Sequence, residues 1–353
     1  MSDDKHPTKK NNPESGSQSD TDEQSAPDSV SRRTYLAHLA AVSSTLMSYS
    51  PHASDETPSI EDGSQKKQIS EPEQLDFGFI KQPPGEMYSL GEHRLHSWSL
   101  GEGMSGEGET TIVFEPGLGG SSLEYLPLAE QVSVRHQVLL YDRAGYGWSD
   151  PGVSPRHVLR LARELKALTT IRGVKNKLIL VGHSYGGLIM REFARLNKDQ
   201  IKGLVLVDSS HEDQFNRLAG KDDVPMLPTS NHFVISAPEL PKGLREDVRK
   251  KILALSRMRK TYSALHAEIS SFRDSCDHIR RQNTTFDFPV IVISRGVNPA
   301  ANKSNGKEAI WHELQTDLLK LSKNSQRRIA TESGHHIHID QPEFIVNAIS
   351  ELS

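Results

Sequence analysis

The chain of 353 residues lacks several features that mark special classes of protein. It contains a single cysteine, Cys276, so no disulfide framework can form within the chain. Charges of the two signs nearly balance at a formal net charge of −4, which leaves no basic field to hold a nucleic-acid backbone. No apolar run approaches the roughly 18 residues that a membrane span needs. We therefore expect neither nucleic acid as a partner nor a stable membrane span.

The first 76 residues also have few hydrophobic side chains. Tyr35 and Tyr49 are their only aromatic residues, and Ser, Asp, Glu, Lys, Gln and Pro dominate the composition. Such a segment cannot bury enough apolar surface to offset the loss of chain entropy on folding. We expect a disordered arm over residues 1–76 and one folded domain over residues 77–353.

Residues 31–53 differ from the rest of this arm. The pair Arg32-Arg33 precedes Tyr35 and Leu36, and a mildly apolar stretch follows. This order resembles a twin-arginine export signal, although polar residues interrupt its apolar part. Two interpretations stay open: an exported protein, periplasmic or extracellular, or a cytoplasmic protein with a short amphipathic stretch in its tail.

Beyond residue 77, short β-rich runs alternate with helical patterns. Five continuous apolar runs predict strands that are buried on both faces, at residues 110–114, 136–141, 177–181, 203–207 and 289–294. Helical spacing predicts helices over residues 155–171 and 185–196, and residues 87–100 indicate an antiparallel lead-in hairpin. This alternation predicts an α/β fold with a mostly parallel central sheet covered by helices on both faces.

The region over residues 211–287 interrupts this alternation. It is rich in charges and mostly helical in pattern, notably at residues 244–259 and 262–281, and it lies between two predicted strands. Ligands of open α/β sheets bind beyond the carboxyl ends of the strands, and an insertion here would lie above those ends. We expect a helical cap over the functional site; the alternative is an extension of the helical layer.

The strongest motif is Gly182-His183-Ser184-Tyr185-Gly186, which directly follows one predicted strand and directly precedes a helix. A serine that exposes its hydroxyl on such a sharp turn needs flanking glycines, because Cβ atoms would collide there. The position at a helix N-terminus also favours negative charge that develops nearby. This context predicts Ser184 as a nucleophile.

With this motif, the chain resembles the α/β-hydrolase superfamily from about Met87 to its end. The resemblance is to the capped branch, which contains esterases, carbon–carbon bond hydrolases, cofactor-free haloperoxidases, epoxide hydrolases and haloalkane dehalogenases. Three further stretches match it, Glu115 to Gly120, Tyr141 to Ser149 and Ser333-Gly334-His335. The branches that open epoxides or displace halide carry an aspartate where this chain has Ser184, so neither activity is expected.

The resemblance also implies roles for other residues. The backbone N–H groups of Leu118 and Tyr185 would form the oxyanion hole, and His335 would be the general base. Many relatives have a histidine before the glycine of the first loop, where this chain has Glu115-Pro116; a backbone donor is little affected by this change. Asp142-Arg143 would shape the turn beside the site.

The acid that orients His335 is the member of the site at which the chain departs from its relatives. Most relatives carry this acid after the strand that corresponds to residues 289–294, but residues 297–306 contain no Asp or Glu. Some relatives carry it one strand earlier, where this chain has Asp208, and Asp208 keeps the chain order Ser, Asp, His. We therefore predict Asp208. The alternatives are Asp213, Glu308 or an acid-free dyad with Asn298.

Two other motifs receive a structural interpretation. His336 and His338 form a His-x-His pair that could bind a metal, but no Cys or carboxylate cluster accompanies them, so we predict ordinary loop or edge residues and no metal site. Residues 101–106 match Gly-x-Gly-x-x-Gly, but they lead into a strand and are surrounded by glutamates that would repel a pyrophosphate. We predict a hairpin loop there and no cofactor.

These observations together predict a serine hydrolase that cleaves an ester-like bond in a small molecule through an acyl-enzyme. A carbon–carbon bond hydrolase or a cofactor-free haloperoxidase would use the same residues, and a non-catalytic ligand-binding module on the same fold is an alternative of another class. Apolar residues in the insertion suggest an apolar acyl or alcohol group under the cap, or else they pack the cap onto the body: Phe215, Met226, Leu227 and Phe233.

Overall fold

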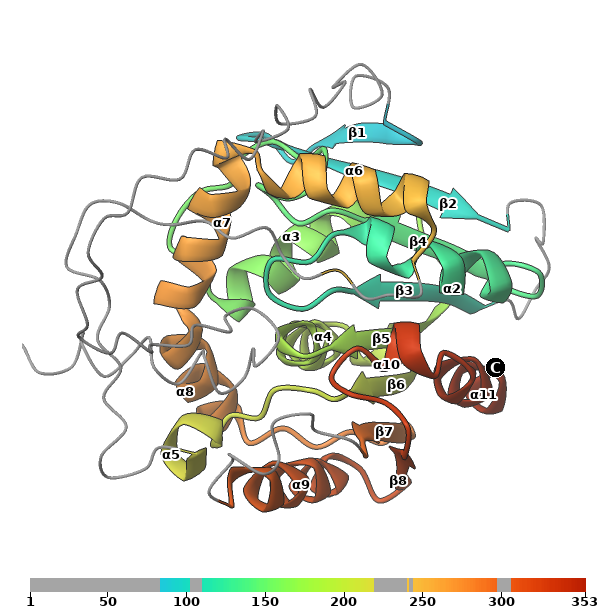
Figure 1. The fold of residues 1–353 in the computed structure, drawn as a ribbon, viewed down its shortest axis with the longest axis vertical. Coiled ribbons are helices and arrows are strands. Elements are labelled where there is room, and N and C mark those ends of the chain that lie inside the picture. The colour runs from blue at the N-terminus through green and yellow to red at the C-terminus, as the bar shows by residue number, and fades with distance from the viewer. Residues whose placement is uncertain (1–82, 102–109, 219–239, 241–243, 297–305) are drawn as a thin grey trace, which may run out of the picture.

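The computed structural model describes residues 83–101, 110–218, 240, 244–296 and 306–353 (Figure 1). Several predictions concern residues outside these ranges. They are the disordered arm over residues 1–76, its twin-arginine-like segment and most of the glycine-rich stretch at 101–106. The same holds for Met226, Leu227, Phe233 and Asn298. These predictions stay predictions.

In the described part of the chain, one sheet of eight strands runs through the molecule in the order β1-β2-β4-β3-β5-β6-β7-β8. β2 pairs antiparallel with both β1 and β4, as predicted for a lead-in hairpin, and the remaining neighbours pair in parallel. The five predicted buried strands are present as β3 to β7. The bounds are β1 Glu86–Ser89, β2 Arg94–Leu100, β3 Thr110–Glu115, β4 Gln137–Tyr141, β5 Lys177–His183, β6 Ile201–Val207, β7 Val290–Arg295 and β8 Ser325–Ala330.

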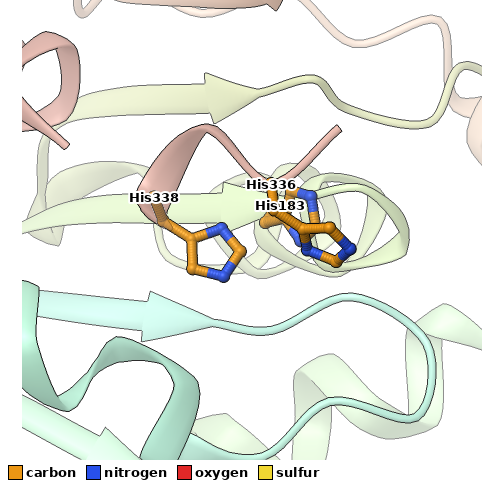
Figure 2. A group of neighbouring side chains, drawn as sticks. All are labelled: His183, His336 and His338. Carbon is orange, nitrogen blue, oxygen red and sulfur yellow. The ribbon is translucent and has the colours of Figure 1, made fainter. Parts of the chain in front are cut away.

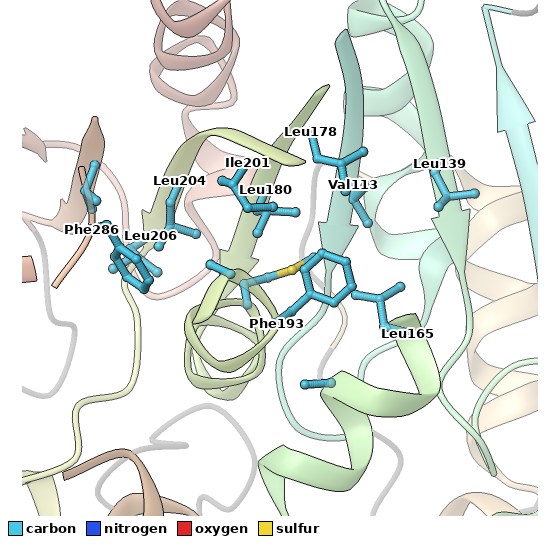
Figure 3. Packing of buried hydrophobic residues seen from close by; sticks show 14 of the residues in the cluster. Val113, Leu139, Leu165, Leu178, Leu180, Phe193, Ile201, Leu204, Leu206 and Phe286 are labelled. Carbon is cyan, nitrogen blue, oxygen red and sulfur yellow. The ribbon is translucent and has the colours of Figure 1, made fainter. Parts of the chain in front are cut away.

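Helices cover both faces of this sheet, which explains why the central strands are apolar throughout. Successive strand residues point to opposite faces. One face packs against α3 (Val158–Ile171), α4 (Tyr185–Leu196) and η6 (Leu318–Leu321), as Figure 3 shows for part of this core. The other face packs against α2 (Leu126–Val132) and α11 (Glu343–Leu352). The predicted fold class, a mostly parallel sheet between two helical layers, is confirmed.

The insertion between β6 and β7 contains α5 (Gln214–Leu218), α6 (Glu246–Ser256), α7 (Arg259–Ser270) and α8 (Phe272–Gln282). In Figure 1, α7 and α8 lie on the side toward which the parallel strands point. The single helix expected over residues 262–281 is two helices that meet at Ser271. The Ser271 hydroxyl donates a hydrogen bond to the Ala267 carbonyl at 2.8 Å, a local bond that competes with regular helix.

Four further elements complete the described chain: η3 (Ser122–Tyr125), η4 (Lys198–Gln200), α9 (Lys307–Asp317) and α10 (Ile337–Asp340). α6 packs its apolar side against η3 and the start of α2, so the insertion contacts the body at more than one place. None of the helices within the described ranges combines the length and the apolar character that crossing a bilayer requires.

Candidate active site

Ser184 lies on a sharp turn between β5 and α4. Its backbone has φ 52° and ψ −123°, a conformation that costs free energy in a residue with a side chain. The glycines around it are required: a Cβ on Gly182 would lie 2.7 Å from the Gly186 carbonyl oxygen, and one on Gly186 would lie 2.4 Å from that of Glu115. The Ser184 N–H donates to the Val207 carbonyl at 3.1 Å, which ties the turn to the end of β6.

Asp208 directly follows β6 and is fully buried. Its carboxylate accepts four hydrogen bonds. Oδ2 accepts from Arg295 Nη1 at 2.7 Å and from His335 Nδ1 at 2.6 Å, and Oδ1 accepts from Trp311 Nε1 at 2.8 Å and from the Arg295 backbone N–H at 3.3 Å. The carboxylate is thus held in one orientation from several sides.

Burial opposes the ionisation of Asp208, but its partners reverse this effect. The charge of Arg295 and the hydrogen bonds from His335 and Trp311 hold the pKa of the Asp208 carboxyl well below its usual range. The group is therefore an anion at neutral pH, and a carboxylate can only accept hydrogen bonds. Its short contact with His335 consequently fixes the proton of that imidazole on Nδ1 and leaves Nε2 as the basic nitrogen.

His335 lies in the turn after β8, next to the Ser184 turn. The ring of His183, the residue before Ser184, has its centroid 4.5 Å from that of His335, and His183 Nε2 donates to the His335 carbonyl at 2.9 Å. Ser184, Asp208 and His335 therefore follow three parallel strands, β5, β6 and β8, at the same edge of the sheet. The structure brings together the three residues that the sequence singled out.

The alternative acids lie elsewhere. Asp213 forms an ion pair with Arg280 at 2.7 Å. Glu308 forms an ion pair with Arg295 at 3.1 Å, and Arg295 in turn pairs with Asp208. Asn298 lies outside the described residues.

The loop after β3 carries Leu118 against the Ser184 turn. A Cβ on Gly117 would lie 3.2 Å from the Ser184 Cβ, so only glycine allows this approach without a shift. Tyr185 is the first residue of α4, and the N–H groups at the start of a helix have no acceptor within it. Both backbone groups predicted for the oxyanion hole thus belong to the segments that flank Ser184.

Arg143 holds this loop in place. Its guanidinium donates to the carbonyls of Pro116 and Gly117, both at 2.8 Å, and to Glu115 Oε1 at 2.6 Å. The same group donates to Glu268 of α7 at 3.0 and 3.1 Å. The Asp142-Arg143 pair, predicted to shape the turn beside the site, therefore also connects the loop to the insertion. Sequence reasoning missed the partners Glu115 and Glu268.

His336 lies in a loop, as predicted, whereas His338 departs from its predicted surroundings. His338 lies in the short helix α10 rather than in a loop or strand and is 3% exposed, so the interpretation of it as a loop or edge residue is wrong. The reason is that Ile337 packs into the core on the side of α2 and α11, and the His338 ring stacks on buried Tyr125. Figure 2 shows His183, His336 and His338 as one group. One ring nitrogen from each lies within 4.8 Å of the others, so these residues could hold a metal ion.

Of the four apolar residues singled out in the insertion, Phe215 of α5 lies within the described residues. It is buried in a cluster with Phe272 of α8 and with Tyr185 and Leu188 of α4, and Leu118 packs against the same cluster. Its ring meets that of Phe272 edge-on at 5.0 Å. Phe215 therefore packs the insertion onto the body.

The fold and this edge of the sheet define an α/β hydrolase, and comparison with known proteins agrees. A profile of the alpha/beta hydrolase fold family matches residues 110–315. The protein YqjL of Bacillus subtilis is 30% identical over 247 residues, which cover 70% of this chain and 85% of YqjL. The chain belongs to the α/β hydrolase fold family, and the prediction of a hydrolase enzyme is confirmed.

Solved structures show the same fold. An epoxide hydrolase from Vigna radiata superimposes with a TM-score of 0.55 at 16% identity, over 75% of this chain and 96% of that one. The enol-lactonase from Burkholderia xenovorans superimposes with a TM-score of 0.52 at 18% identity, over 76% of this chain and 99% of that one. At these identities the likeness establishes the fold, and the reaction has to be inferred from the site.

Proposed function

We propose that this chain is a serine hydrolase of the carboxylesterase type, with Ser184 as nucleophile, His335 as general base and Asp208 as the orienting acid. The observation that carries the proposal is the 2.6 Å contact between Asp208 Oδ2 and His335 Nδ1 beside the strained Ser184 turn. An anionic acid, an imidazole with its proton fixed on Nδ1 and a serine at the end of the neighbouring strand are the parts that acyl transfer requires.

The reaction would proceed in two halves. Ser184 attacks the carbonyl carbon of the ester while His335 Nε2 takes the hydroxyl proton, and the backbone N–H groups of Leu118 and Tyr185 stabilise the oxyanion. His335 then gives the proton to the departing alcohol, which leaves an acyl-enzyme. Water, deprotonated by the same imidazole, hydrolyses the acyl-enzyme and restores Ser184. The chemistry requires no cofactor or metal ion.

Ester cleavage suits this site better than the opening of an epoxide. Although one structural neighbour is an epoxide hydrolase, the resemblance places an aspartate nucleophile in that branch, where this chain has Ser184. Another neighbour is an enol-lactonase, and a lactone is a cyclic ester. The insertion over residues 211–287 would act as a cap that holds a small-molecule substrate and excludes water.

Hydrolysis of a p-nitrophenyl ester series of increasing acyl length tests the proposal. We expect turnover by the full chain, loss of turnover in Ser184→Ala, and wild-type turnover in the control Ser263→Ala, which changes an exposed serine on α7. A fluorophosphonate probe should label Ser184 and leave Ser184→Ala unlabelled. Turnover that survives in Ser184→Ala, or a wild-type protein that neither turns over esters nor takes the label, would overturn the proposal in favour of a binding role.

If the probe labels Ser184 but no ester is cleaved, the nucleophile is active and the ester class is wrong. Carbon–carbon substrates would then be tested, because that branch of the superfamily uses the same residues.

A further inference from the structure

Three imidazole side chains, those of His183, His336 and His338, lie close together beside His335. The ring centroids of His183 and His338 are 4.9 Å apart, and His336 is 5.6 Å from each of them (Figure 2). His183 ends β5, His336 directly precedes α10 and His338 lies within it. The group is thus built by two elements that meet only in the fold.

Most of the nitrogens in this group have no hydrogen-bond partner among the described residues. These buried atoms are His183 Nδ1, His336 Nδ1 and both ring nitrogens of His338. A buried polar atom without a partner is unfavourable, because it has lost its hydrogen bonds to water. A ligand that accepts nitrogen lone pairs would remove part of that cost.

The spacing of the rings fits a tetrahedral metal ion. Zinc binds imidazole nitrogens at about 2.0–2.1 Å, which puts each ring centre about 3.2 Å from the ion and three such centres about 5.2 Å apart. The observed separations of 4.9 and 5.6 Å bracket this value. The nitrogens themselves lie within 4.8 Å of one another, and tetrahedral zinc needs them about 3.3 Å apart, so binding requires the rings to turn toward a common ion.

The charge state of the rings also suits a metal. Burial and the neighbouring histidines lower the pKa of His183 and His338 well below the usual range and that of His336 to about 3. All three rings are therefore neutral at pH 7, the form that coordinates metal. Among the described residues the group contains three neutral nitrogens and no carboxylate, a set that favours zinc and similar ions over magnesium or calcium.

We propose that His183, His336 and His338 form a binding site for a zinc ion. The site lies beside the proposed general base, because the His335 ring is 4.5 Å from that of His183 and 5.6 Å from that of His336. The proposal concerns metal binding at this group and is tested without any measurement of activity.

Zinc binding can be measured without any enzyme activity. Calorimetric titration of the chelator-treated full chain with zinc should show one ion per chain. We expect the affinity for zinc to fall at least about tenfold in both His338→Phe and His336→Asn, because a site left with only two imidazoles binds the ion much more weakly. The matched control His266→Phe, at an exposed histidine of α7, should bind as the wild type does.

Phe at position 338 keeps an aromatic ring against Tyr125, whose ring stacks on His338 at 4.6 Å, and His336→Asn is a second variant at a less buried position. Thermal unfolding without metal would identify any variant that has lost its fold. The zinc-site proposal is wrong if the folded variants bind zinc as tightly as the wild type, or if the wild type binds none.

Discussion

His335 Nδ1 lies 2.6 Å from Asp208 Oδ2, although 127 positions separate the two residues in the chain. Asp208 reaches this position with a positive φ of 40°, and Arg295 and Trp311 hold its carboxylate from the other sides. Because strands β6 and β8 both end at this edge of the sheet, the contact depends on the whole parallel arrangement. It supplies the first test of the proposed mechanism.

Asp208→Asn should lower kcat by about 10³–10⁴-fold, since an asparagine neither fixes the His335 tautomer nor stabilises the imidazolium. Steady-state kinetics with a p-nitrophenyl ester would measure the loss, and thermal unfolding would show whether the fold is kept. The control is Asp213→Asn, which changes an acid that pairs with Arg280 in the insertion. Turnover within a few-fold of the wild type would exclude Asp208 as the acid.

The sequence predicted the fold, and it singled out Ser184 as the candidate nucleophile, because both signals are local. An apolar run between turn residues predicts a buried strand, and Gly-x-Ser-x-Gly between a strand and a helix predicts a sharp turn. Asp208 could be predicted only through the resemblance and by elimination. A lone Asp after a strand is otherwise indistinguishable from a turn residue.

The partners of these residues could not be predicted from local pattern. Arg295 and Trp311 approach Asp208 from positions 87 and 103 residues away, and neither carries a local motif. The burial of His338 was missed for the same kind of reason, because the packing of α10 against Tyr125 and the core depends on tertiary structure. Side chains that meet only through the fold leave no spacing to read in the sequence.

Glu268 offers a test of how the insertion is attached. It is fully buried in α7 and accepts hydrogen bonds from Arg143 and, at 3.0 Å, from the Tyr146 hydroxyl. Glu268→Gln keeps the shape but removes the charge opposite Arg143, and breaking a buried ion pair costs about 3–5 kcal/mol. We expect a loss of that size in the free energy of unfolding, measured by denaturant titration.

The matched control is Glu246→Gln, which changes a side chain on α6 that is 72% exposed. We expect it to lower stability by less than about 1 kcal/mol. Equal effects of the two substitutions would mean that the Glu268 cluster does not hold the insertion to the body.

Glu124 should make stability depend on pH. It lies in η3, which follows the loop that carries Leu118, and its carboxylate accepts a hydrogen bond from the Ser121 N–H at 3.1 Å. Burial raises the pKa of Glu124 from 4.5 to about 7. The folded state then binds a proton more tightly than the unfolded state. The resulting stability is fully present below pH 4.5 and is lost as the pH rises through about 7.

Glu124→Gln keeps the acceptor oxygen but cannot ionise. Between about pH 5 and pH 8, we expect the free energy of unfolding of the wild type to fall by on the order of 1–3 kcal/mol relative to this variant. Thermal unfolding measured across that pH range would show the change. Glu130→Gln, at an exposed position of α2, serves as the control and should track the wild type. A constant difference between Glu124→Gln and wild type at all pH values would contradict the raised pKa.

The backbone conformation that the proposed nucleophile Ser184 needs should lower the stability of the fold. A side chain at φ 52° and ψ −123° is strained by about 1–3 kcal/mol, whereas glycine adopts this conformation without that strain. Glycine also loses more chain entropy on folding, by about 0.5–1 kcal/mol. Ser184→Gly should therefore be more stable than Ser184→Ala by about 1 kcal/mol, although neither variant should turn over an ester.

Denaturant unfolding of the two variants measures this difference, and the pair Ser210→Gly and Ser210→Ala gives the control. Ser210 is buried nearby and does not have a positive φ, so glycine should be the less stable residue there. The reversed order at Ser184 would show that the strain belongs to this one turn. If Ser184→Gly proves less stable than Ser184→Ala, the strain in this turn is smaller than the entropy cost of glycine, and the prediction is wrong.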